Sequence, residues 1–221
     1  MQSRRAPHWK ALAGCTLAAA AVLALAAPAG AQLASRAAEE WIKTLDSPNR
    51  ISAMRVGEII AALKIQKGSA IADIGAGSGA LSGPLALETG PTGLLFAVDI
   101  EKGLLEHIDQ RAAAQRIGNI RTVLGAFTDP TLPQQVDLAF INDVLHHIED
   151  RATYLKNLAR YIKPGGRIAI VDFKPETSPH RSQPELVVSE AQTEAWLQAA
   201  GLTLSEKPAL FDDRFYVIYV R

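Results

Sequence analysis

The residues best suited to chemistry lie in a glycine-rich segment that follows a short apolar run. The run ends with Asp73 and Ile74, and Gly75, Gly77 and Gly79 follow at alternate positions. Glycine permits sharp turns that let a ligand lie against the main chain, and a helix that begins after the turn offers free N–H groups. The pattern predicts a nucleotide-binding cleft at the end of a strand.

A second acidic residue suits the same cleft. Asp99 ends the next apolar run, where a carboxylate can accept hydrogen bonds from both hydroxyls of a ribose. Gly75-x-Gly77-x-x-Ala80 together with Asp99 also satisfies the dinucleotide fingerprint. These residues alone therefore leave an NAD(P)-dependent oxidoreductase open.

Polar residues also follow the predicted strand at 136–141, namely Asn142, Asp143, His146 and His147. Ligands of open α/β sheets bind at this edge, and imidazole titrates near neutral pH. His146 or His147 is therefore a candidate general base, and the alternative is that one packs at a helix start while the other is solvated. The five histidines lack the spacing of a zinc motif, so no metal site is expected.

Alternating strands and helices must position these side chains. Short apolar runs predict five buried central strands, at residues 70–74, 94–98, 120–124, 136–141 and 167–171. Two final strands are expected at about 202–207 and 214–220. This order predicts one α/β domain with a Rossmann-like, doubly wound, seven-stranded and mostly parallel sheet that carries helices on both faces.

Helices are predicted from apolar periodicity and from capping signals. Residues 36–45 and 51–64 are expected to be helical, and to pack on the sheet edge or cover a ligand cleft. Leu155, Leu158, Ala159 and Ile162 share one face of a helix that Lys163-Pro164-Gly165-Gly166 stops. Ser189 and Gln192 form a capping box for a helix that ends at Gly201. The segment 173–184 is either a substrate lid or a surface loop.

Four motifs in order resemble those of class I S-adenosylmethionine (SAM)-dependent methyltransferases. They are Asp73-x-Gly75-x-Gly77-x-Gly79, Phe96-Ala97-Val98-Asp99-Ile100, Val136-Asp137-Leu138-Ala139-Phe140 and Ile162-Lys163-Pro164-Gly165-Gly166-Arg167. The resemblance covers about residues 50 to 175 and is greatest to the small-molecule branch that includes the ubiquinone and menaquinone biosynthesis enzymes. It implies methyl transfer from SAM to a small-molecule acceptor. An oxidoreductase and a catalytically silent exported SAM-binding protein are the alternatives.

The resemblance also assigns residues to the cofactor. The implied SAM contacts are Asp73, Gly75, Ala76, Gly77, Gly79, Asp99, Ile100, Ala126, Phe127, Asn142 and Asp143. Family members usually carry Gly-Asp after the third strand, whereas this chain has Gly125-Ala126-Phe127-Thr128-Asp129. Either Asp129 or a backbone carbonyl is expected to hold the adenine amine there, with Ala126 and Phe127 as adenine contacts.

The first thirty-one residues predict export. Arg4, Arg5 and Lys10 precede an apolar stretch, and small residues lead to a cleavage site after Ala31, so residues 1–31 are interpreted as a signal peptide and 32–221 as the methyltransferase domain. A retained membrane anchor is the alternative, and both the general and the twin-arginine routes to the periplasm are open. After cleavage no stable membrane insertion is expected.

Charge and cysteine content exclude several partners. Three of the 23 basic and none of the 23 acidic side chains lie in residues 1–31, which leaves 20 against 23 and a net charge of about −3. A mildly acidic domain is a poor general binder of nucleic acid. Cys15 is the only cysteine, so the predicted mature chain has neither a disulfide nor a thiolate metal site. The oligomeric state does not follow from the sequence.

Overall fold

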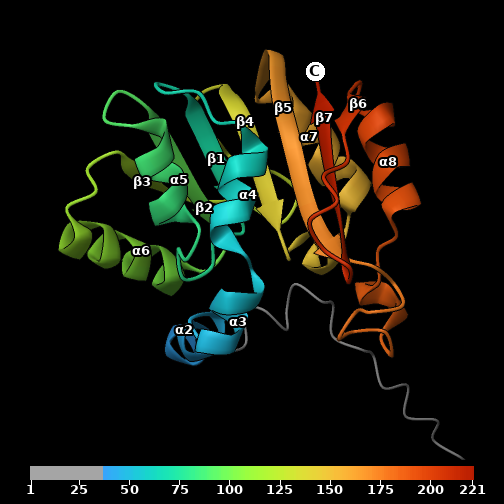
Figure 1. Ribbon diagram of the computed structural model, residues 1–221, viewed down its shortest axis with the longest axis horizontal. Coiled ribbons are helices and arrows are strands. Elements are labelled where there is room, and N and C mark those ends of the chain that lie inside the picture. The colour runs from blue at the N-terminus through green and yellow to red at the C-terminus, as the bar shows by residue number, and fades with distance from the viewer. Residues whose placement is uncertain (1–36) are drawn as a thin grey trace, which may run out of the picture.

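The computed structural model describes residues 37–221, and these contain a seven-stranded sheet in the order β3-β2-β1-β4-β5-β7-β6 (Figure 1). The strands are β1 Ala70–Ile74, β2 Leu94–Asp99, β3 Ile120–Leu124, β4 Val136–Asn142, β5 Ile162–Phe173, β6 Thr203–Glu206 and β7 Arg214–Val220. Neighbouring strands among β1 to β5 pair in parallel, whereas β7 is antiparallel to both β5 and β6. The predicted Rossmann-like, mostly parallel fold is confirmed.

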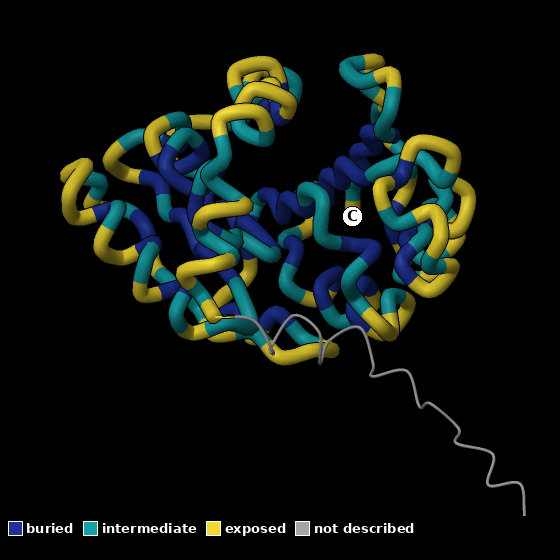
Figure 2. The backbone as a smooth tube through the Cα atoms, turned by 90° about the horizontal axis from the view of Figure 1, so that it is seen from below, coloured by how far each residue is buried: buried dark blue, intermediate teal, exposed yellow. Residues whose placement is uncertain are grey.

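Helices cover both faces of the sheet. Apolar side chains of α4 (Val56–Leu63), α5 (Ser82–Thr89) and α6 (Lys102–Gln115) pack on one face, and those of α7 (Arg151–Arg160) and α8 (Glu190–Ala199) pack on the other. Viewed from below, the buried strands run between helices whose outer surfaces are exposed (Figure 2). The short helices α2 (Ala38–Leu45) and α3 (Pro48–Ala53) lie apart from both layers at one end of the sheet (Figure 1).

The central strands β1, β2 and β4, the second half of β5, and β7 are mostly apolar and buried because helices cover both faces of the sheet there. In β5, Ile168 and Ile170 join the core beneath α7 and α8, while Ala169 and Val171 join the core beneath α4 to α6. The same alternation holds in β7. The capping box predicted at Ser189 is present, with the side chain of Gln192 returning to the Ser189 backbone N–H.

Three local predictions were wrong. The helix expected at 51–64 is broken between α3 and α4, where Arg55 has a φ of 52° and bonds the Glu58 carboxylate and the Leu210 carbonyl. The helix expected to include Ile162 ends at Arg160, because β5 begins at Ile162 and Val136 pairs with that residue. Strand β3 is an edge strand rather than a buried one, and Leu124 at its end is 57% exposed.

Among residues 37–221 no helix combines the length and the apolar character needed to span a membrane. The predicted signal peptide at residues 1–31 lies outside the described residues.

Candidate functional site

A cavity of about 450 Å³ opens where the carboxyl ends of β1, β2 and β4 meet, in the volume range of small-molecule sites. Every residue that the sequence assigned to the site lines this cavity, except Gly79. The lining residues among those predicted are Asp73, Gly75, Ala76, Gly77, Asp99, Ile100, Ala126, Phe127, Asn142, Asp143, His146 and His147. The structure therefore brings together side chains from four loops at one edge of the sheet.

The glycine-rich turn forms the cavity floor between β1 and α5. Gly75 and Gly77 have φ values of 68° and 57°, which strongly favour glycine. A Cβ atom on Gly75 would lie 2.5 Å from the Val144 side chain. Gly79 packs instead against α6, where a Cβ atom would lie 2.9 Å from Ile108 Cγ1. Gly75 and Gly77 thus leave the backbone of the turn open to a ligand, and Gly79 lets the turn approach α6.

Asp99 closes the turn from the end of β2. Its Oδ2 accepts a 2.8 Å hydrogen bond from the Gly77 N–H, and its Oδ1 accepts one of 3.0 Å from the Glu101 N–H. Burial holds the pKa of Asp99 above its ordinary value, although these N–H groups favour the charged form. Each carboxylate oxygen can accept a second hydrogen bond. Asp99 therefore retains the acceptor capacity that two ribose hydroxyls would use.

Asp73 lies beneath the turn and is almost fully buried. It accepts a 2.6 Å hydrogen bond from the Ser82 hydroxyl at the start of α5. Burial raises the pKa of Asp73 to about 6; the Ser82 bond opposes that shift and the charge of Asp99 adds to it. The residue joins β1 to α5 and so fixes the geometry of the turn between them.

The loop after β3 presents Ala126 and Phe127 to the cavity, but not Asp129. The Asp129 carboxylate accepts hydrogen bonds from the Tyr161 hydroxyl at 2.9 Å and from the Thr131 N–H at 2.7 Å. It is therefore engaged away from the cavity. Of the two expected ways of holding an adenine amine, the backbone carbonyl is the one that this loop geometry favours.

Helices α2 and α3 cover the cavity from the other side, a role that the sequence indicated only in general terms. These helices contribute Trp41, Thr44, Leu45 and Arg50 to the lining, and Met54, directly after α3, adds to it. Asp46 fixes this cover, because it accepts a 2.6 Å hydrogen bond from the Ser78 hydroxyl and lies 3.1 Å from Arg111 of α6. Arg50 was not predicted, since its ion-pair partner is remote in the sequence.

The two predicted histidines lie in the 3₁₀ helix η1 (Leu145–His147), immediately after β4. The Nδ1 atom of His146 lies 2.7 Å from Asp172 Oδ1, and Asp172 Oδ2 accepts the His146 backbone N–H at 3.1 Å. A carboxylate in this position fixes the orientation of the imidazole and the location of its proton. His146 is buried and tightly held, so it is not the solvated residue of the alternative interpretation.

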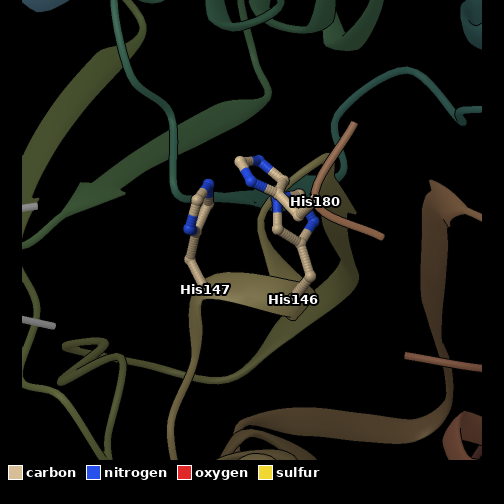
Figure 3. Close-up of side chains that lie close together, drawn as sticks. All are labelled: His146, His147 and His180. Atoms are coloured by element: carbon tan, nitrogen blue, oxygen red, sulfur yellow. The ribbon is translucent and has the colours of Figure 1, made fainter. Parts of the chain in front are cut away.

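His147 lies beside His146, and a third histidine from the segment 173–184 joins them (Figure 3). The His180 ring centroid lies 5.1 Å from that of His146 and 5.5 Å from that of His147. Burial, with smaller contributions from the neighbouring His146 and His180, lowers the pKa of His147 to about 3, so His147 is uncharged at neutral pH and a weak base. Phe173, Pro179 and His180 line the cavity, so this segment forms part of its wall.

Three features define a Rossmann-like domain that binds a small ligand. They are a glycine turn at the end of β1, an acid at the end of β2, and a covered cavity where the strand order reverses between β1 and β4. Residues 65–208 match the family described as "Methyltransferase domain". The chain therefore belongs to this methyltransferase-domain family, and the resemblance seen in its motifs is confirmed.

Curated relatives share part of the chain. A demethylmenaquinone methyltransferase from Geobacillus sp. (strain WCH70) is 27% identical over 116 residues, which are 52% of this chain and 50% of that protein. A 2-phytyl-1,4-naphtoquinone methyltransferase from Trichormus variabilis is 36% identical over 108 residues, 48% of this chain and 47% of that protein. The chain thus spans about half the length of these relatives.

Solved structures share the fold across most of the chain. A SAM-dependent methyltransferase from Aquifex aeolicus superimposes with a TM-score of 0.74 at 22% identity, and the match covers 84% of this chain and 99% of that one. The magnesium protoporphyrin IX methyltransferase from Synechocystis, solved with bound SAM, gives a TM-score of 0.67 at 20% identity over 89% of this chain and 99% of that one. These similarities show that the fold is shared.

Proposed function

We propose that this protein transfers a methyl group from SAM to a small-molecule acceptor. The observation that carries the proposal is the juxtaposition of Asp99, with acceptor capacity to spare, and the glycine turn at Gly75 and Gly77 in one covered cavity. Membership of the methyltransferase-domain family and the named relatives support it. An oxidoreductase gains no support from these relatives.

The residues present fit the cofactor. Asp99 can accept the ribose hydroxyls, and Ile100 and Phe127 offer apolar surface to an adenine ring. We assign Asp143 and the backbone of the glycine turn, which line the same cavity, to the charged methionine end of SAM. When bound, SAM supplies a methyl group already activated on a sulfonium sulfur. The protein therefore has to align the acceptor with that methyl group and exclude water, which α2 and α3 do by covering the cavity.

We assign the acceptor to the end of the cavity that His146 and His147 line with polar groups. Phe173 adds apolar surface to the lining, directly after the Asp172 that holds His146. The cavity of about 450 Å³ has to hold SAM together with the reacting part of the acceptor, so the part of the acceptor that enters is of small-molecule size. Relatives named for quinone and naphthoquinone methylation support an acceptor of that class.

Calorimetric titration of the purified protein with S-adenosylhomocysteine tests the proposal, with NADH as the matched nucleotide control. Saturable binding of S-adenosylhomocysteine but not of NADH is the expected result. Binding of NADH alone would refute the assignment and restore the oxidoreductase, and binding of neither would also contradict a cofactor cleft. A positive result then justifies a screen of phenolic, quinol and amine acceptors for methyl transfer.

We further propose that the protein is exported to the periplasm. The support is the order of basic residues, apolar stretch and small residues that ends at Ala31. Mass spectrometry of the protein recovered from the periplasm should show a chain that begins at Gln32. Recovery of the intact chain in the cytoplasmic fraction alone would contradict export.

A further inference from the structure

We propose that His146, His147 and His180 bind a divalent transition-metal ion such as Zn²⁺ at the acceptor end of the cavity. Each histidine offers one ring nitrogen, and these atoms all lie within 4.8 Å of one another. Three nitrogens bound to one tetrahedral zinc ion would be about 3.4 Å apart, given Zn–N bonds of about 2.0–2.1 Å. Small side-chain rotations therefore bring the cluster to ligand geometry.

Hydrogen bonds around the cluster leave the Nε2 atoms of His146 and His180 available as ligands. The Nδ1 atom of His146 faces the Asp172 carboxylate at 2.7 Å, and the Nδ1 atom of His180 faces the Gln183 side-chain oxygen at 3.2 Å. Both partners are acceptors, so Nδ1 carries the proton and Nε2 keeps its lone pair. Metal-bound histidines typically donate their other ring N–H to such a carboxylate or carbonyl oxygen. Two of the three histidines already have this support.

The carboxylates nearby are committed to other partners. Asp143, His146 and Asp172 also lie within ligand distance of one another. However, Asp143 pairs with Arg50, and Asp172 accepts from the His146 ring, from the His146 backbone N–H and from the Phe173 N–H. The three imidazoles are therefore the better ligand set.

Two segments that are remote in sequence build the cluster. His146 and His147 follow β4, whereas His180 follows β5, and the parallel pairing of β4 with β5 brings their carboxyl ends together (Figure 3). The sequence led to the expectation of no metal because no local motif holds all three ligands. The juxtaposition is a tertiary feature.

Three protein ligands leave coordination positions open, as in catalytic rather than structural zinc sites. This inference rests on the proposed function and adds that the acceptor carries a hydroxyl or thiol that binds the metal. The metal lowers the pKa of that group, and the proton passes to solvent water. The acceptor oxygen or sulfur then forms a bond to the methyl carbon while the carbon–sulfur bond of SAM breaks, and the leaving sulfur keeps the electron pair as a thioether. The histidines act here as ligands rather than as general bases.

Metal affinity tests the inference directly. The full protein, freed of any polyhistidine tag and of bound metal, is titrated with Zn²⁺ in competition with a chromophoric chelator. One tight site per chain is expected, and His147→Ala/His180→Ala should weaken Zn²⁺ binding by about 100-fold or more, since loss of supporting residues alone costs about 10- to 100-fold. His107→Ala is the matched control, because His107 lies on α6 outside the cluster, with Asp46 at 3.8 Å.

Two further measurements keep the outcomes distinct. Co²⁺ in place of Zn²⁺ should give the intense visible absorption of a low-coordinate site, and the double variant should lose it. S-adenosylhomocysteine binding, measured on the same samples, reports that each variant is folded. Zinc binding that is absent, or equal in the double variant and in the His107→Ala control, would overturn the metal site. If S-adenosylhomocysteine still binds in that case, the proposed function stands without the metal.

Discussion

The guanidinium of Arg50 lies 2.6 Å from the carboxylate of Asp143, and this ion pair joins the cover of the cavity to the end of β4. Asp143 is 9% exposed and has a φ of 58°, a left-handed conformation that is uncommon outside glycine. Burial raises the pKa of Asp143, and the charge of Arg50 opposes that shift. The pair thus gives the buried carboxylate a counter-charge at the wall of the cavity and holds α3 above it.

Replacing Arg50 should loosen the cover. We expect Arg50→Gln to weaken S-adenosylhomocysteine binding by about tenfold, equivalent to about 1.4 kcal/mol, because α3 loses its tether and Asp143 loses its counter-charge. Hydrogen exchange of the α2 and α3 amides should accelerate in the same variant. Arg160→Gln, at the exposed end of α7, is the control. Unchanged affinity and unchanged exchange would show that the ion pair does not hold the cover.

Asp99→Ala should abolish cofactor binding while the fold survives. The substitution removes the carboxylate that closes the glycine turn and the acceptor for the ribose hydroxyls, and hydrogen bonds to charged groups contribute about 1.5–3 kcal/mol each. We expect an affinity loss of about 100-fold or more by calorimetry, with a cooperative unfolding transition retained. Asp129→Ala is the control. It removes an acid of the neighbouring loop whose carboxylate bonds Tyr161, and this variant should bind the cofactor with wild-type affinity. Retained binding in Asp99→Ala would refute the cleft assignment.

Stability should fall as pH rises through the titration of Asp73. Its pKa is about 6 in the folded protein and 3.8 for an unperturbed aspartate, so the folded state holds this proton more tightly. The destabilisation is absent below about pH 4 and complete above about pH 6. Between about pH 4.5 and pH 7.5 the titration of Asp73 should lower the free energy of unfolding by about 2 kcal/mol, at about 1.4 kcal/mol per unit of pKa.

Asp73→Asn isolates this contribution, because the amide oxygen can still accept from Ser82 but does not titrate. Urea unfolding of both proteins at the two pH values gives the comparison. The wild type should lose about 2 kcal/mol more than the variant over that interval. Equal pH dependence in the two proteins would mean that Asp73 titrates as it does in the unfolded chain.

The sequence predicted the sheet and the cofactor side of the cavity well because those features are locally encoded. Strands buried on both faces read as continuous apolar runs, and the turn at Gly75 and Gly77 requires residues that tolerate positive φ. Asp99 was found because it ends a strand. Each of these signals lies within one short segment.

The features that the sequence did not predict depend on contacts between distant segments. The break at Arg55 is stabilised through Leu210, and Arg50 acquires a role only through Asp143. His180 belongs to a loop whose course is set by the end of β5. Ile162 continues the helical period of α7, yet its pairing with Val136 places it in a strand, so tertiary pairing overrides local periodicity.

Gly75→Ala should both destabilise the protein and close the cofactor cleft. Gly75 has a φ of 68°, and an added Cβ atom would lie 2.5 Å from both Cγ1 and Cγ2 of Val144. The backbone strain alone costs about 1–3 kcal/mol. Because Val144 directly precedes the turn that carries His146, relief of the overlap must shift either the glycine turn or the histidines. We expect a lower urea midpoint and at least a tenfold loss of S-adenosylhomocysteine affinity.

Two companion variants separate the causes. Gly118→Ala has open space around the new Cβ atom and no positive φ, so stability and binding should change little. Adding Val144→Ala to Gly75→Ala removes the steric overlap but not the backbone strain, and it should recover part of the lost binding. If Gly75→Ala alone keeps wild-type stability and affinity, then neither the left-handed turn nor its contact with Val144 is required for the cleft.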